Sequence, residues 1–167
     1  YLCFAEWNFI DMPTFVGMKN IEALFNDRIF WKSILNTFIY ILIVVPSTLL
    51  CSLGLALLTN RKLPFMKFYR GALFLPMVTS TVAIAMVWSF IYQPNGGILN
   101  TFLGFFGVEE LPGWLVDTKY ARFAVSLVGI WLKVGYYYII FDKKKKNIPT
   151  ELYEAADIDG ASSFQKF

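Results

Sequence analysis

The sequence contains no histidine and only two cysteines, and it lacks the common phosphate-binding loops. Neither G-x-x-x-x-G-K-[ST] nor G-x-G-x-x-G occurs, and Cys3 and Cys51 form no C-x-x-C pair. No acid or base stands beside a nucleophile, so no catalytic residue can be named. We therefore expect a protein that is not an enzyme, has no cofactor or metal site, and cannot hydrolyse ATP by the usual machinery.

Charge is also missing from three long stretches. Residues 37–59 and 71–92 carry no charged side chain, and residues 123–141 carry only Lys133. Each stretch is close to the roughly 20 residues that cross a bilayer core as a helix. The chain is 57% hydrophobic, which is too apolar for an ordinary soluble domain. The sequence predicts an all-α, multi-pass transmembrane helical bundle, and the absence of an initiator Met suggests a fragment of a larger membrane domain.

Basic residues are distributed unevenly between these apolar runs. The segments 60–70 and 142–167 carry nine Lys and Arg residues, against five in the other, longer segments outside the runs. Lys and Arg are in excess on the cytoplasmic side of membrane proteins, so their location says more than the net charge of +3. We expect membrane lipid as a partner, and nucleic acid is not implied. We predict an outer-side or interfacial segment at 1–36, transmembrane helices at 37–59, 71–92 and 123–141, an outer loop at 93–122, and cytoplasmic segments at 60–70 and 142–167.

The last twenty residues predict a helix, a turn and the start of a second helix. Pro149 suits the first turn of a helix, where its missing N–H costs nothing. Asp159 and Gly160 then end this helix in a turn that we expect to need a positive φ at the glycine. Ser162 and Gln165 have the spacing of a capping box, which predicts the second helix.

The first of these helices is too short to be stable alone in water. Its apolar positions therefore need a surface to pack on, and its acidic residues suit the positive N-terminal end. Small side chains would allow a close approach. The residues of this predicted docking surface are Glu151, Leu152, Glu154, Ala155, Ala156, Asp159 and Gly160.

The string I-P-x-E-L-x-E-A-A-x-x-D-G-A, residues 148–161, resembles the EAA loop of the permease subunits of binding-protein-dependent ABC importers. In that family the loop is cytoplasmic and sits in a groove of the ATPase subunit. Residues 15–37 and the string F-Y-R-G-A-L-F-L-P, residues 68–76, resemble the carbohydrate-type branch. The resemblance implies a multi-pass sugar permease of the inner or cytoplasmic membrane that works with an ABC ATPase subunit, a second permease subunit and an extracytoplasmic solute-binding protein.

Polar and aromatic residues inside the apolar runs are candidates for the translocation path. A lysine there is costly and by default faces the bundle interior or water, although it can also snorkel or pair with a helix end. Hydroxyls at this depth also bond helix backbones, and aromatic rings pack in the membrane interface as well as against sugars. The candidates, each with such a structural alternative, are Thr79, Trp88, Trp131, Lys133 and Tyr137.

The resemblance breaks at D-K-K-K-K, residues 142–146, where the family usually has apolar or small residues. This tract is interpreted either as a charge anchor on acidic lipid headgroups or as an altered stretch of sequence. Either would shorten or stiffen the link to the docking element, and we expect weaker transport. Two other functions stay open: a permease of the same superfamily for another small solute, and a membrane anchor or channel that does not transport.

Overall fold

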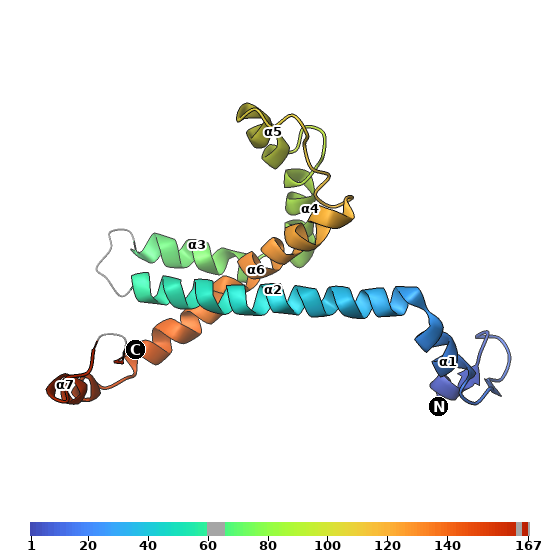
Figure 1. The fold of residues 1–167 in the computed structure, drawn as a ribbon, viewed down its shortest axis with the longest axis horizontal. Coiled ribbons are helices and arrows are strands. Elements are labelled where there is room, and N and C mark those ends of the chain that lie inside the picture. Colours follow the sequence, from blue (N-terminus) through green and yellow to red (C-terminus); the bar gives the residue numbers. More distant parts are fainter. Residues whose placement is uncertain (60–65, 163–164, 167) are drawn as a thin grey trace. The chain divides into compact units, whose positions relative to one another are not determined.

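The computed structural model describes residues 1–59, 66–162 and 165–166 (Figure 1). Its contacts divide the chain into two compact units, Tyr1–Leu42 and Ile43–Phe167. Apart from one short two-stranded ladder, the elements of the described residues are helices. The prediction of an all-α architecture is confirmed.

The first unit begins with a small hairpin held by a side-chain amide. Asn20 donates from Nδ2 to the carbonyl oxygens of Cys3 and Ala5, at 3.2 and 3.0 Å. Asp27 separates two helices, and its Oδ1 accepts from the N–H of Ile29 at 2.7 Å. The elements before this break are η1 (Leu2–Phe4), the antiparallel strands β1 (Ala5–Glu6) and β2 (Thr14–Phe15), and α1 (Lys19–Asn26).

Among the described residues, two helices are long and apolar enough to cross a membrane, and a bent pair of helices is a third span if it crosses as one. The helices α2 (Arg28–Leu58) and α6 (Thr118–Lys146) each meet this criterion alone. The helices α3 (Met66–Val78) and α4 (Thr81–Ile91) meet it only as a pair, which is bent by 104°. The depth at which each crosses the membrane stays a prediction from the sequence.

The range 71–92, expected to be one helix, contains parts of two. Pro76 lies inside α3 and removes one backbone donor. Ser80 has φ −56° and ψ 130°, outside the helical region, and serves as the N-cap of α4. Its carbonyl oxygen accepts from the N–H of Ile84 at 3.0 Å, so a new helix begins there. The run without charge continues across this break, but Pro76 and the hydroxyl residues 79–81 stand at it.

The two long helices extend beyond the apolar runs that predicted them. The helix α2 begins within the segment assigned to 1–36, and α6 begins within the outer loop assigned to 93–122. The tract at 142–146 continues α6 as its last turns instead of opening a loop. Lysine is a good helix former and its charge is favourable at a helix C-terminus, so the tract suits this position.

The helix α3 packs against α6 with no side chain between the two backbones at one point. A Cβ placed on Gly135 would lie 1.9 Å from the carbonyl oxygen of Leu73. Further along α6, Arg70 donates from Nε to Oη of Tyr138 at 3.3 Å and pairs through Nη2 with Oδ2 of Asp142 at 3.4 Å. Successive turns of α6 therefore hold one face of α3.

A buried amide organises the segment between α4 and α6. Asn100 lies on α5 (Ile98–Phe105) and is 1% exposed. Its Nδ2 donates to the carbonyl oxygens of Pro94 and Pro112, both at 3.0 Å, and its Oδ1 accepts from Nε1 of Trp114 at 2.7 Å. Both amide hydrogens and the oxygen are bonded, as a buried polar group requires. The two ends of this loop are thereby fixed to its middle.

We predict that Gly135→Ala destabilises the full-length protein, because the new Cβ would overlap the Leu73 carbonyl and force α3 away from α6. Overpacking of this kind costs about 1–3 kcal/mol, which thermal unfolding in detergent would measure. Gly71→Ala is the control, since Gly71 is also helical but has no atom within 4 Å of an added Cβ. Equal melting temperatures for the two variants would contradict the close approach.

Candidate functional site

A cavity of about 140 Å³ between α2 and α6 brings together two of the predicted path residues. The helix α6 contributes Lys133 and Tyr137, of which the lysine is exposed and the tyrosine half-buried. The helix α2 contributes one polar residue, Thr48, and an apolar wall made of Val44, Val45 and Leu49. An ammonium group, a hydroxyl and an aromatic ring therefore share one small space.

Thr48 was not among the predicted residues. Its side chain is 2% exposed, and its Oγ1 has no hydrogen-bond partner among the described residues. A buried polar group without a hydrogen-bond partner costs roughly 1–3 kcal/mol. A hydrogen bond from Thr48 to a solute hydroxyl would remove this cost. A signal was present in the sequence: Val44, Thr48, Ser52 and Ala56 recur every four residues and form the buried stripe of α2.

The candidates Trp88 and Trp131 meet in a row of aromatic rings. Their ring centroids lie 5.6 Å apart, edge to face. Trp88 also contacts Tyr92 at 5.2 Å, and Tyr92 contacts Trp114 at 6.0 Å. The hydroxyl of Tyr92 donates to the carbonyl oxygen of Ala124 at 3.1 Å. These contacts tie α4 to α6 and to the loop that holds Trp114, so both tryptophans have a packing role.

Thr79 stands apart from the other candidates. It lies between α3 and α4 with an exposed side chain, and its Oγ1 donates to the carbonyl oxygen of Leu75 at 2.8 Å. Within the described chain, no hydrogen bond or ring contact joins it to the cavity or to the aromatic row. Its hydroxyl is hydrogen-bonded to the backbone of the adjacent helix, which is the structural alternative to a place in the translocation path.

The predicted docking residues lie on and just after α7 (Thr150–Ile158). Pro149 is the N-cap, one position earlier than expected, and Glu151 lies in the first turn. Leu152 is 62% exposed and Ile158 is 88% exposed, and Glu154 is exposed beside them. Within the described part of the second unit, this helix therefore presents apolar side chains that nothing covers.

The end of α7 is a Schellman motif. Gly160 has a φ of +75°, as the sequence predicted. The N–H of Ala161 bonds to the carbonyl oxygen of Ala156 at 2.9 Å, and the N–H of Gly160 bonds to that of Asp157 at 3.1 Å. The chain after α7 therefore leaves in a fixed direction.

The capping box expected after this turn is present in its two side-chain hydrogen bonds. The N–H of Ser162 donates to Oε1 of Gln165 at 2.8 Å, and the N–H of Gln165 donates to Oγ of Ser162 at 3.4 Å. The helix expected to start there falls partly on residues 163–164, which lie outside the described residues.

The site has no group that points to metal chemistry within the described ranges. No cluster of three or more His, Cys, Asp and Glu side chains could hold an ion there. Cys3 and Cys51 are free and exposed. The cavity offers hydrogen bonding, a positive charge and an aromatic face, which are the means of binding a polar solute.

Curated relatives match the chain along almost its whole length, although no model of a known protein family matches it. A probable ABC transporter permease of Pyrococcus horikoshii is 37% identical, over 100% of this chain and 58% of its own. A probable starch degradation products transport system permease of Thermoanaerobacterium thermosulfurigenes is 33% identical, over 100% and 56%. A lactose transport system permease of Rhizobium radiobacter is 34% identical, over 93% and 53%. The chain thus spans somewhat more than half the length of these relatives.

A solved structure shares the fold. A bacterial ABC transporter involved in the import of the acidic polysaccharide alginate superposes on 90% of this chain and 53% of its own, with a TM-score of 0.78 and 24% identity. These relatives are named as transport permeases, in agreement with the expectation of a protein that is not an enzyme. Over nearly its whole length, the chain is thus similar to part of the permease subunits of ABC transporters, some of which are named for sugars.

Proposed function

We propose that this permease imports sugars, driven by ATP that a separate ATPase subunit hydrolyses. Relatives named for lactose, starch degradation products and diacetylchitobiose support a sugar as the solute. The observation that carries the proposal is the continuity of α6, which lines the cavity with Lys133 and ends beside α7. A second permease subunit and an extracytoplasmic solute-binding protein complete the proposed assembly.

The helix α6 can act as a lever between the two sites. From Lys133 to Lys146 it is roughly 20 Å long, at a rise of 1.5 Å per residue. The link to α7 is short, and the N–H of Asn147 bonds back to the carbonyl oxygens of Lys143 and Lys144, both at 3.2 Å. A displacement of α7 by the closing ATPase pair would therefore reach the cavity through one rigid element, as alternating access requires.

The exposed side of α7 is the proposed contact with the ATPase. Leu152 and Ile158 supply apolar area, and the small side chains of Ala155 and Ala156 allow a close approach. An amphipathic helix of this kind binds by laying its apolar face in a groove. The charge of Glu154, one turn before Ile158, would select the orientation of the bound helix.

The cavity between α2 and α6 is the proposed part of the translocation path that this chain supplies. The Thr48 hydroxyl can bond a sugar hydroxyl, and the Tyr137 ring can stack on a sugar face. Its volume of about 140 Å³ is below the roughly 300–1,000 Å³ of complete ligand sites. We infer that the second permease contributes the remaining wall.

A second candidate solute is an anionic or polyol-like compound. Lys133 places a positive charge in the cavity wall, and relatives are named for sulfoquinovosyl glycerol and for osmoprotective compounds. A site that is built around a cation binds an acidic solute more tightly than a neutral one. Competition of uptake by sulfonated against neutral sugars separates the two candidates.

We predict that Glu154→Arg removes the ATPase from the permease, because it reverses the charge at the exposed face of α7. Purification of the full-length protein from its native membrane, followed by identification of the proteins that accompany it, measures this. The same reversal at Glu110, which is exposed in the predicted outer loop, is the control and should retain the ATPase. If no ATPase accompanies even the unaltered protein, the coupling role of α7 is wrong.

We predict that Gly160→Val uncouples transport while the protein still inserts in the membrane. A β-branched residue at a φ of +75° carries a strain of roughly 1–2 kcal/mol, which the Schellman motif relieves by opening. ATP-driven uptake in vesicles should fall several-fold. Gly107→Val creates similar strain at a φ of +82°, also in open space but far along the chain from α7, and should leave uptake near normal.

We predict that Thr48→Val raises the KM for uptake several-fold without loss of stability. The valine keeps the shape of the side chain and removes a hydroxyl that has no partner among the described residues, so only solute binding is lost. Ser126→Ala is the matched control, since Ser126 is also buried with an unpartnered hydroxyl but does not line the cavity. The same KM in both variants would exclude Thr48 from the path.

A further inference from the structure

A second cavity, of about 410 Å³, lies where α2, α6 and α7 meet within the second unit. Its volume is within the roughly 300–1,000 Å³ of small-molecule sites. One side of it is apolar and belongs mainly to the last turns of α2. The side chains on this wall are Leu53, Ala56, Leu57, Phe141 and Ile148.

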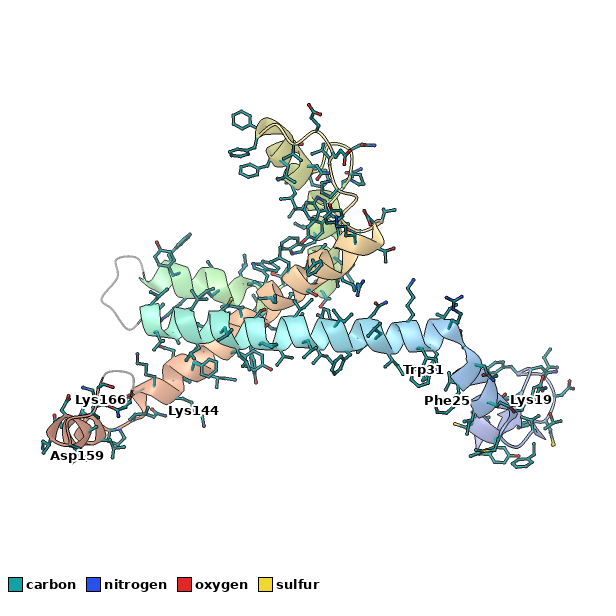
Figure 2. All side chains as sticks on the ribbon, viewed as in Figure 1. Lys19, Phe25, Trp31, Lys144, Asp159 and Lys166 are labelled. Atoms are coloured by element: carbon teal, nitrogen blue, oxygen red, sulfur yellow. The ribbon has the colours of Figure 1, made fainter. Side chains whose placement is uncertain are left out.

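The lining of this cavity also contains basic side chains. Lys144 and Lys145 line it from the end of α6, and Lys166 lines it from the chain that follows α7. Figure 2 labels Lys144 and Lys166 at these two places. Lys166 forms an ion pair with Asp157, the one acidic residue of the lining. The remaining lining charge is therefore positive and comes from Lys144 and Lys145. Lys145 is half-buried, so an anion beside it would offset the cost of its partial removal from water.

The backbone at the end of α6 does not oppose an anion. Carbonyl oxygens at a helix C-terminus carry partial negative charge that would repel one. Here the N–H of Asn147 donates to the carbonyl oxygens of Lys143 and Lys144, both at 3.2 Å. The N–H of Ile148 donates to the carbonyl oxygen of Lys145 at 3.4 Å. These bonds reduce the repulsion that an anion beside Lys144 and Lys145 would meet from the carbonyl oxygens.

The order of residues along α6 matches the layers of a membrane leaflet. The apolar run ends at Phe141 in the cavity wall, and the lysines follow within the next turn. Basic residues directly after a membrane span attract the anionic headgroups of the cytoplasmic leaflet. The apolar wall therefore matches the acyl chain of one lipid molecule, and the lysines match its phosphate.

We propose that this cavity binds one acidic phospholipid of the cytoplasmic leaflet. Its phosphate lies between Lys144 and Lys145, and an acyl chain lies along Leu53 and Leu57. The lipid thereby bridges the ends of α2 and α6 beside the joint to α7. The assignment rests on the predicted cytoplasmic position of this end, and it depends neither on the solute nor on the ATPase.

Native mass spectrometry of the full-length protein in detergent tests the proposal, with phosphatidylglycerol or phosphatidylcholine added in turn. We expect one phosphatidylglycerol to be retained in preference to phosphatidylcholine. The double variant Lys144→Gln/Lys145→Gln should weaken this retention roughly tenfold, because two lysine contacts with the phosphate are lost. The matched control Lys119→Gln/Arg122→Gln removes the same charge at the other end of α6 and should retain the lipid.

A second variant separates the cavity from general electrostatics. Leu57→Trp fills the apolar wall without a change of charge, and it should also lower the retention of phosphatidylglycerol. Equal retention of the two lipids, or equal loss in the two double variants, would overturn the proposal. Displacement of the lipid by inorganic phosphate would identify a phosphate site instead. An unaltered protein that retains neither lipid would also overturn the proposal.

Discussion

At Gly135 the backbone of α6 passes so close to the Leu73 carbonyl that no side chain fits between them. In a membrane, where apolar burial does not distinguish protein from lipid, close backbone packing is a main source of helix association. Residues two positions away on an α-helix point to the opposite side. The contact with α3 therefore turns Lys133 and Tyr137 toward α2, where they line the small cavity.

Toward the predicted cytoplasmic end, this packing continues through an ion pair. The side chains of Arg70 and Asp142 are 44% and 14% exposed, and partly solvated pairs contribute about 0–1 kcal/mol. The closest approach of the two helices is therefore at Gly135, which under the proposed lever role would be a fixed point. This ion pair also gives Asp142 a structural role, although it belongs to the tract at 142–146 that departs from the family pattern.

Much of this arrangement is readable from the sequence, because it depends on composition and local rules. Missing charge predicted the apolar helices, and the string ending in Gly160 predicted the helix and the left-handed turn after it. The break at Ser80 was missed because hydropathy is the same on both sides of it. Asn100 was missed because the role of a buried polar residue depends on which distant groups come within reach, here Pro112 and Trp114. Thr48 was missed although the four-residue spacing of the buried stripe of α2 includes it.

The fully bonded amide of Asn100 has a consequence for anything that meets this loop. Its hydrogen bonds join residues on both sides of α5, so the loop has its shape before a second molecule arrives. A surface that is already ordered loses little conformational entropy on association. The exposed rings of Phe102, Phe105 and Phe106 are therefore presented as a rigid aromatic face. A molecule that binds this face would need a complementary shape, and the loop would not have to fold during binding.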